Sequence, residues 1–168
     1  PTGQAGLRKA AFSPDETRVL TVGRMPPTLK EWDLATGAEL VAMTGQLRYF
    51  DTAAYYGDGR RAIAGGGYHG LEAWDLDTGQ LIKQWKSDYC AYDLVISADG
   101  RRALVGERHR ASEWDLEEYK LLNVFSGHHG HAVTAQGYSS NPDELFTGSR
   151  DGSVRRWNRL EAKVLHRW

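Results

Sequence analysis

The chain has 168 residues, and its 21 lysines and arginines nearly balance its 22 aspartates and glutamates. A formal net charge of −1 gives no net field that favours nucleic acid or an anionic membrane. A single cysteine, Cys90, excludes an internal disulfide and a multi-cysteine zinc site. No apolar run approaches the roughly 18 residues of a membrane span. We therefore expect no nucleic-acid partner, no membrane and a reducing, cytoplasmic location. Because the chain begins with proline, we also expect a fragment or processed piece of a longer protein.

Nineteen glycines, six tryptophans and short apolar stretches are typical of short strands joined by tight turns. In chain order, one group of markers occurs four times. A turn comes first (SPDE, YGDG, SADG, NPDE), then an aliphatic run closing on glycine (RVLTVG, RAIAGG, RALVGE, ELFTGS), then a tryptophan (KEWDL, EAWDL, SEWDL, RRWNR). These tryptophans are Trp32, Trp74, Trp114 and Trp157. The spacing of roughly forty residues indicates a structural repeat.

Each repeat is predicted to form four strands, which in the third repeat are YDLVIS, RRALVGE, RASEWDL and KLLNVFS. The Asp-Gly and Pro-Asp turns accept the dihedral angles that an antiparallel meander needs. No segment shows a sustained period of 3.6 residues, so the sequence predicts an all-β fold.

The repeats resemble those of WD-repeat β-propellers over nearly the whole chain, residues 6–168. The Trp-Asp dipeptide is present in three repeats and becomes Trp157-Asn158 in the fourth. The resemblance implies four four-stranded antiparallel blades near residues 6–43, 44–84, 85–126 and 127–168, as half or part of a propeller. The second and third repeats contain Asp-Gly-Arg-Arg-Ala, and in this they resemble the repeats of bacterial WD-repeat proteins.

The fourth repeat has the fullest signature of that family, with Gly127-His128, Ser149, Asp151 and Trp157. The resemblance implies a hydrogen-bonded chain. Asp151 would fix one nitrogen of the His128 ring, and the Ser149 hydroxyl would join the other nitrogen to the Trp157 indole. We therefore expect a structural role for His128 rather than a catalytic one.

Two further histidines, His129 and His131, follow in SGHHGHAV. Spaced two residues apart on a strand, they could share a face and bind zinc or copper, but the sequence shows no third protein ligand. A solvated loop between blades is the favoured interpretation, so we expect no metal and no other cofactor.

The first three repeats depart from the signature. Six residues before their tryptophans lie Pro26, Tyr68 and Arg108 instead of aspartate, and the Gly-His dipeptide is absent. We expect these blades to be held by tryptophan packing and strand pairing alone.

The residue immediately before each tryptophan is also unusual, because it is charged in three repeats: Glu31, Glu113 and Arg156, with Ala73 in the other. We expect these charges to be exposed at the blade margins. The alternative is that Glu113 pairs with Arg156 of the neighbouring blade.

The resemblance implies that protein partners are bound by the upper rim, the edge where the chain enters the innermost strand of each blade. Arginine, tyrosine and methionine at such positions are typical of binding hot spots, although each residue taken singly is more often plain surface. The predicted rim residues are Arg8, Met25, Tyr49, Asp51, Gly67, Cys90, Tyr92, Glu107, Ala132, Thr134 and Arg150.

Paired arginines, Arg60-Arg61 and Arg101-Arg102, follow two of the turns and are expected on the opposite, lower rim. They could bind acidic ligands, but the neighbouring acids Asp58 and Asp99 favour solvated turns.

The favoured function is a non-catalytic scaffold for a protein or peptide partner. The sequence contains neither a phosphate-binding loop nor GxSxG, and no base lies beside Cys90. Two alternatives stay open: a sensor or docking part of a larger signalling enzyme such as a bacterial kinase, and a hydrolase with its site in the propeller channel.

Four blades would span about half of the seven- or eight-bladed ring that is usual in this family. The bare sides of the first and fourth blades predict association, either as a homodimer that completes the ring or with further blades. A compact four-bladed ring is the remaining alternative.

Overall fold

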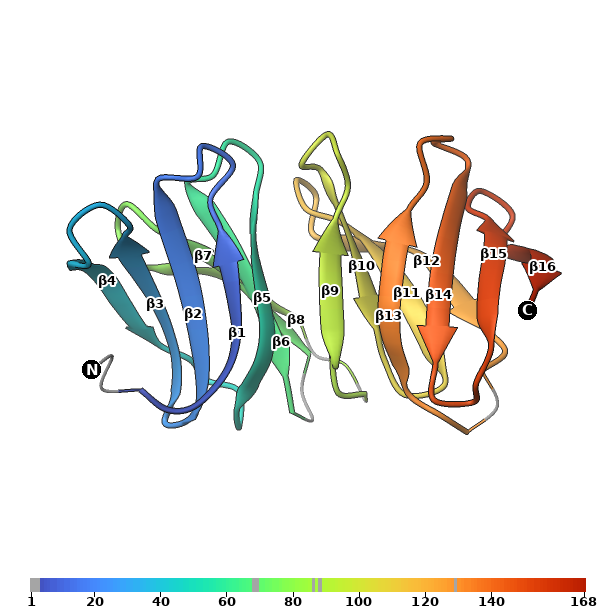
Figure 1. The fold of residues 1–168 in the computed structure, drawn as a ribbon, viewed down its shortest axis with the longest axis horizontal. Helices are drawn as coiled ribbons and strands as arrows, with labels where there is room; N and C mark the ends of the chain where they lie inside the picture. Colours follow the sequence, from blue (N-terminus) through green and yellow to red (C-terminus); the bar gives the residue numbers. More distant parts are fainter. Residues whose placement is uncertain (1–3, 68–69, 86, 88, 129) are drawn as a thin grey trace. The chain divides into compact units, whose positions relative to one another are not determined.

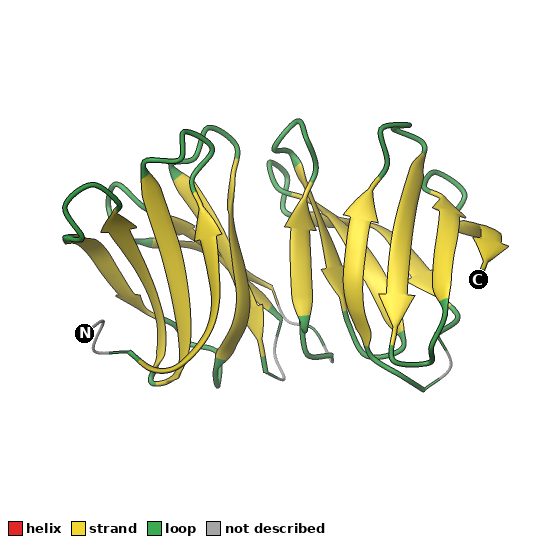
Figure 2. Cartoon of the chain, viewed as in Figure 1, coloured by secondary structure: helices red, strands yellow, loops and turns green. Residues whose placement is uncertain are grey.

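The computed structural model describes residues 4–67, 70–85, 87, 89–128 and 130–168 (Figure 1). Every regular element in this part of the chain is a β-strand, and none is a helix (Figure 2). The strands form four antiparallel four-stranded sheets, so the predicted all-β class with four blade-like sheets is confirmed. No helix that could cross a membrane occurs among the described residues. The chain divides into two compact units, Pro1–Ala91 and Tyr92–Trp168.

The first unit holds the first and second sheets, coloured blue to green in Figure 1. Strand β5 packs against β1 and β2, which joins the two sheets. The strands of the first sheet are β1 (Ala5–Phe12), β2 (Arg18–Met25), β3 (Pro27–Asp33) and β4 (Glu39–Thr44). Those of the second sheet are β5 (Phe50–Tyr56), β6 (Arg61–Gly66), β7 (Leu71–Asp75) and β8 (Leu81–Trp85).

The second unit holds the third and fourth sheets, coloured yellow to red. Here β13 packs against β9 and β10. The strands of the third sheet are β9 (Asp93–Ile96), β10 (Arg102–Gly106), β11 (Arg110–Asp115) and β12 (Lys120–Ser126). Those of the fourth sheet are β13 (Val133–Tyr138), β14 (Glu144–Ser149), β15 (Val154–Asn158) and β16 (Lys163–Arg167).

The residue after each tryptophan builds the turn that leads to the outermost strand. The Asp33 carboxylate accepts hydrogen bonds from the backbone N–H and the hydroxyl of Thr36, at 2.8 and 2.7 Å. Asp75 does the same with Thr78. The amide oxygen of Asn158 accepts from the Glu161 N–H at 2.9 Å. A short side-chain acceptor is all that such a turn needs, which explains why asparagine can replace aspartate in the fourth repeat.

Each tryptophan also marks an irregularity in strand pairing. The register between the third and fourth strands shifts between the tryptophan and the residue before it in all four sheets. The core of the first unit includes Leu20, Phe50 and Trp74. In the core of the second unit, Trp157 meets the ring of Phe125 edge to face, at 5.6 Å between centroids. Two of the four repeat tryptophans, Trp74 and Trp157, therefore belong to the cores, whereas Trp32 and Trp114 are half-buried.

Candidate partner-binding site

The fourth sheet contains a buried hydrogen-bonded chain of four side chains. His128 Nδ1 lies 3.1 Å from Asp151 Oδ2, His128 Nε2 lies 2.7 Å from Thr147 Oγ1, and the Trp157 indole N–H donates to the same Thr147 oxygen at 2.8 Å. Tryptophan can only donate and a carboxylate can only accept, so the arrangement that satisfies every group has each donor pointing toward Asp151. In that arrangement the His128 ring is neutral with its proton on Nδ1, in agreement with a pKa that burial lowers, and the ring is committed to the fold.

The structure corrects one predicted member of this chain, because Thr147 takes the place expected for Ser149. Leu145 pairs with Trp157 across β14 and β15, so Thr147 is the diagonal neighbour of the indole, whereas Ser149 lies two residues further along the same face. The Ser149 hydroxyl instead accepts from the backbone N–H of Asp151 at 3.2 Å.

Electrostatics agree with the direction of this chain. Burial lowers the pKa of His128 and outweighs the raising effect of Asp151. Burial acts to raise the pKa of Asp151, but hydrogen bonds from Ser153 and His128 hold it well below its usual range. Arg155 stands over the Trp157 ring and 3.6 Å from Asp151 Oδ2. Gly127 has a φ of +141°, which residues with a side chain rarely adopt, and this backbone conformation explains the glycine before His128.

The first sheet has a similar chain built from other residues. The Trp32 indole donates to Thr21 Oγ1 at 2.8 Å, and the Thr21 hydroxyl donates to the Gln4 side-chain oxygen at 2.6 Å. Gln4 in turn donates to the Thr28 hydroxyl at 2.9 Å. The expectation that the first three blades rely on packing and strand pairing alone is therefore wrong. In the first sheet the side-chain amide of Gln4 takes the place that the His128 ring has in the fourth.

The third sheet uses a carboxylate for the same purpose. The Trp114 indole donates to Ser112 Oγ at 2.8 Å, and the Ser112 hydroxyl donates to Glu107 Oε1 at 3.1 Å. Arg110 Nε holds the other oxygen of Glu107 at 2.6 Å. Glu107 is only 2 % exposed, so its prediction as a partner-binding rim residue is corrected to a structural role.

In the second sheet, Glu72 anchors the loop before β5. One oxygen of this buried carboxylate accepts from the backbone N–H groups of Gln46 and Leu47, both at 2.9 Å, and from the Gln84 amide at 3.2 Å. Burial raises the pKa of Glu72 despite these hydrogen bonds. The Trp74 indole lies beside this carboxylate without reaching hydrogen-bond geometry.

The carboxylates before Trp32 and Trp114 are buried, which overturns the expectation of exposed blade margins. Glu31 Oε1 lies 3.0 Å from Arg18 Nη1 and accepts from the Tyr55 hydroxyl of the second sheet at 2.9 Å. Two charges can be buried in this way because they neutralise each other, and the Tyr55 hydroxyl gives the carboxylate a second hydrogen-bond donor.

Glu113 is also fully buried, and its partners are not the one considered from the sequence. The Asn123 amide donates to it at 3.1 Å, and Arg159 Nη1 lies 3.5 Å away. Arg156 instead faces Glu144 at 3.8 Å. The third sheet therefore pairs its glutamate with an arginine that lies two residues after Trp157.

The upper rim of the first unit holds a compact charged group, here named the rim cluster: Arg8, Arg24, Tyr49 and Asp51. Asp51 Oδ1 accepts from Arg8 Nε at 3.1 Å and from Arg24 Nε and Nη2 at 2.8 and 2.6 Å. The Arg24 guanidinium also lies over the Tyr49 ring, 4.6 Å from its centroid. The Asp51 side chain is 8 % exposed, whereas those of Arg8 and Arg24 are 48 % and 38 % exposed. Asp51 therefore organises two arginines that remain open to solvent.

Further predicted rim residues of the first unit border this cluster. Met25 follows Arg24 at the end of β2 and is 77 % exposed. Cys90 is half-buried and adds to the raised pKa of Tyr49, for which burial is the main cause. A Cβ at Gly67 would come within 2.7 Å of the Tyr49 ring, so glycine makes room for this tyrosine.

The predicted rim residues of the second unit form no comparable group. Arg150 is exposed, and its backbone N–H donates to the carbonyl of the buried Ala132 at 3.0 Å. Tyr92 and Thr134 are half-buried. Ala132 forms an isolated bridge with Arg108.

The remaining histidines give no support for a metal centre. His131 is exposed, and His129 lies outside the described residues. Within the part of the chain that the structure describes, no three His, Cys, Asp or Glu side chains are grouped so that they could hold a metal ion.

The sequence did not predict Arg24 as a rim residue. The resemblance to WD-repeat propellers selects its neighbour Met25 as a partner-binding position, and not Arg24 itself. The only sequence signal is its alternation with Met25 along β2. Such alternation shows that the two side chains lie on opposite faces, but it does not identify the Asp51 carboxylate on the next sheet as the partner.

Comparisons with known proteins agree with this fold. Residues 119–158 match the family described as WD domain, G-beta repeat. The chain is similar to GID complex subunit 7 of Schizosaccharomyces pombe, with 27 % identity over 56 % of this chain and 19 % of the relative. It is 22 % identical to WD repeat domain-containing protein 83 homolog of Dictyostelium discoideum, over 62 % of this chain and 32 % of the relative. It is 25 % identical to U3 small nucleolar RNA-associated protein 15 homolog of Xenopus laevis, over 98 % and 34 %.

These relatives are eukaryotic, so the expected resemblance to bacterial WD-repeat proteins is not supported. The chain spans about a third or less of the length of each of them. The matched repeat, the names of the relatives and the four four-stranded sheets together support a WD-repeat family for this chain.

Proposed function

We propose that this chain is a non-catalytic scaffold that binds a protein partner through the rim cluster of its first unit. Relatives that include a subunit of a protein complex support the scaffold role. The observation that carries the choice of site is the pair of half-exposed arginines, Arg8 and Arg24, fixed on the carboxylate of Asp51. The scaffold acts in the cytoplasm.

The chemistry of the cluster favours an acidic partner segment. Two guanidinium groups share one carboxylate, so the cluster keeps one positive charge in excess. Because Asp51 and the Tyr49 ring hold Arg24 in place, little side-chain entropy is lost when a partner carboxylate binds. The adjacent Met25 offers exposed apolar area for the rest of the contact.

We expect Arg24→Glu to weaken partner binding strongly while the chain stays folded. Reversing the charge removes the donor and repels an acidic segment, which corresponds to a loss of about tenfold or more in affinity. The measurement is quantitative affinity purification from cells that make the protein, comparing the wild type with the variant.

The matched control is Arg60→Glu, which reverses another exposed arginine outside the cluster. The proteins recovered with the wild type should be retained by this control. Equal recovery with both variants would show that the cluster is not the binding site.

We further propose that the flanks of the first and fourth sheets, each of which carries exposed apolar residues, cover each other in a pair of chains. In the fourth sheet, Tyr138 pairs with Leu145, which pairs with Trp157. In the first sheet, Phe12 pairs with Val19, which pairs with Trp32, so Phe12 occupies the same register position as Tyr138. Phe12 is exposed. On the fourth sheet, Arg156 precedes the tryptophan as Glu31 and Glu113 do elsewhere.

The residues at these positions are complementary. Two sheets have a tyrosine at the register position of Phe12. Tyr55 of the second sheet lies beside Glu31 of the first, and Tyr138 of the fourth lies beside Glu113 of the third. In a pair of chains, Phe12 of one copy would lie against Arg156 of the other, where an arginine can rest on an aromatic ring. Exposed apolar area at Val154 and Trp168 extends the same flank.

We expect the wild-type chain to sediment as a dimer at high concentration and Phe12→Arg to sediment as a monomer. Ile82→Arg, an exposed apolar position on β8, is the control and should not alter sedimentation. A wild type that stays monomeric on concentration would favour completion by further blades or a compact ring.

A further inference from the structure

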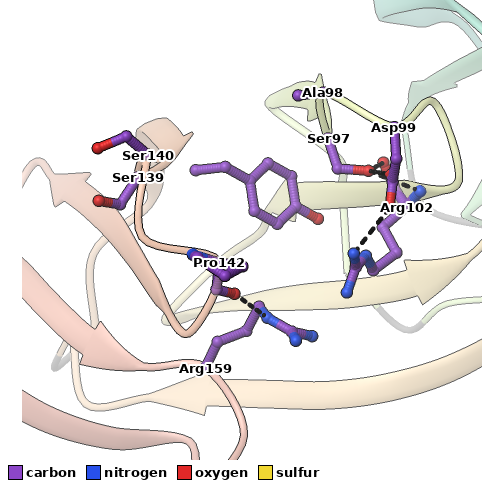
Figure 3. Close-up of a pocket in the computed structure, with 9 residues that line it drawn as sticks. Ser97, Ala98, Asp99, Arg102, Ser139, Ser140, Pro142 and Arg159 are labelled. Atoms are coloured by element: carbon purple, nitrogen blue, oxygen red, sulfur yellow. Dashed lines mark hydrogen bonds and ion pairs between the residues drawn. The ribbon is translucent and has the colours of Figure 1, made fainter.

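The second unit contains a pocket on its lower rim, at the strand ends opposite to its own predicted rim residues Ala132 and Arg150. It has a volume of about 250 Å³ and lies between the turn at residues 97–99 and the loop at residues 139–142. Figure 3 shows Arg102 below the first of these segments and Arg159 below Pro142 of the second. Arg102 belongs to the Arg101-Arg102 pair. The sequence predicted a solvated turn for this pair and therefore assigned it no function.

Both arginines are held in position by other groups. Arg102 Nη2 donates to Asp99 Oδ2 at 2.8 Å. Arg159 Nε donates to the carbonyl oxygen of Pro142 at 2.7 Å, and its Nη1 lies 3.5 Å from Glu113. Their side chains are mostly buried. The guanidinium groups are therefore oriented before any ligand binds, and each has further N–H groups beyond those used.

Two buried polar atoms at the pocket lack a hydrogen bond. Arg102 Nε has no partner, and the Tyr138 hydroxyl lies beside the Glu113 carboxylate without reaching hydrogen-bond geometry. Burial, and then the charge of Glu113, raise the pKa of Tyr138, so this hydroxyl keeps its proton and remains a donor. Glu113 Oε1 is unsatisfied as well, so a small shift would pair it with the Tyr138 hydroxyl. Arg102 Nε is then the buried group at the pocket that lacks a partner, and such groups are rare in native proteins.

The corresponding residues of the first unit are fully engaged. There Arg18 binds Glu31, the Tyr55 hydroxyl donates to the same carboxylate, and Arg18 Nη2 donates to the Gly59 carbonyl at 3.2 Å. The turn at Gly59 packs directly against Pro14. The arginine, glutamate and tyrosine of the second unit have the same arrangement in sequence but leave hydrogen-bonding capacity open at a pocket.

We propose that this pocket binds the carboxylate of an acidic side chain, most closely a glutamate, from a partner protein. A planar carboxylate fits the forked edges of two guanidinium groups. Pro142 and Ala98 line the pocket and offer apolar contact to the methylene groups. The volume falls below the roughly 300–1,000 Å³ typical of small-molecule sites, which favours one side chain over a cofactor.

The charges around the pocket predict modest affinity. Asp99 and Glu113 balance Arg102 and Arg159, so binding depends on directed hydrogen bonds and not on a surplus of positive charge. This site is separate from the rim cluster, and its occupant need not be the partner bound there.

The test is a titration of the full ¹⁵N-labelled chain with N-acetyl-glutamate N-methylamide, followed by NMR. We expect saturable shifts of the Arg159 side-chain Nε–H and of the backbone amides of Ser139 and Ser140. The neutral glutamine analogue should produce none. Arg102→Gln should weaken binding roughly tenfold, because one charge-assisted pair is lost.

Arg101→Gln is the matched control, because Arg101 belongs to the same arginine pair but is exposed and faces Glu117 at 3.6 Å. It should bind as the wild type does. Arg102→Lys keeps the charge beside Asp99 and removes the fork, so it tests the site if the glutamine variant does not fold.

Several results would overturn the proposal: no saturation with the glutamate probe, equal shifts with the glutamine analogue, or equal weakening by Arg101→Gln. Tighter binding of N-acetyl-phosphoserine N-methylamide would also overturn it and would assign the pocket to phosphate groups. Arg24→Glu should leave this titration unchanged, so its outcome is independent of the rim cluster.

Discussion

Glu31→Ala is expected to lower the free energy of unfolding of the chain by about 3 kcal/mol. The substitution leaves Arg18 and the Tyr55 hydroxyl without the carboxylate that both now bind, inside the core region of the first unit. Breaking a buried pair typically costs about 3–5 kcal/mol, and the lower end applies because the Arg18 side chain keeps 23 % exposure. Urea unfolding followed by far-ultraviolet circular dichroism measures the effect.

The control for this prediction is Glu39→Ala. Glu39 binds Lys30 at 2.7 Å, but its side chain is 41 % exposed, so its loss should cost less than about 1 kcal/mol. Glu31→Gln keeps an acceptor for Tyr55 and should fall between the two. Similar losses for Glu31→Ala and Glu39→Ala would contradict a buried structural role for Glu31.

Asp151→Ala is expected to destabilise the second unit by about 2 kcal/mol. The carboxylate is the final acceptor of the chain that runs from Trp157 through Thr147 and His128, and it also binds Ser153. Its removal leaves the buried His128 Nδ1–H without its main acceptor. Urea unfolding followed by tryptophan fluorescence is a suitable measurement, because Trp157 is a member of this hydrogen-bonded chain.

Arg150→Ala, at the exposed neighbouring position, should change the stability by no more than about 0.5 kcal/mol. Within the chain, Thr147→Val should cost more than Ser149→Ala, since only Thr147 joins His128 to Trp157. The reverse order, or equal losses for Asp151→Ala and Arg150→Ala, would show that the hydrogen-bonded chain does not contribute to stability.

The sequence was sufficient for the fold class because turn chemistry and the spacing of Trp32, Trp74, Trp114 and Trp157 are local signals. Each turn is built by side chains a few residues apart, such as Asp33 with Thr36. Register across strands is not local. Thr147 and Ser149 share a face of β14, and only the pairing of Leu145 with Trp157 decides which hydroxyl reaches the indole.

Contacts between sheets were the least predictable part. Glu31 was expected at an exposed margin, because nothing in the sequence shows that Arg18 and Tyr55 converge on it from another strand and another sheet. The same limit applies to the rim cluster. Arg8, Tyr49 and Asp51 could be selected from family positions, but Arg24 becomes visible only when its guanidinium is seen over Tyr49.

The most direct measurement of partner binding at the rim cluster is site-specific photo-crosslinking in cells that make the protein. A benzoylphenylalanine replaces Met25, which is exposed and adjacent to Arg24, or Arg60 as the comparison position. We predict a discrete crosslinked partner from position 25, its loss when Arg24→Glu is added, and none from position 60. Equal products at both positions, or a product at position 25 that survives Arg24→Glu, would contradict a partner-binding role for the cluster.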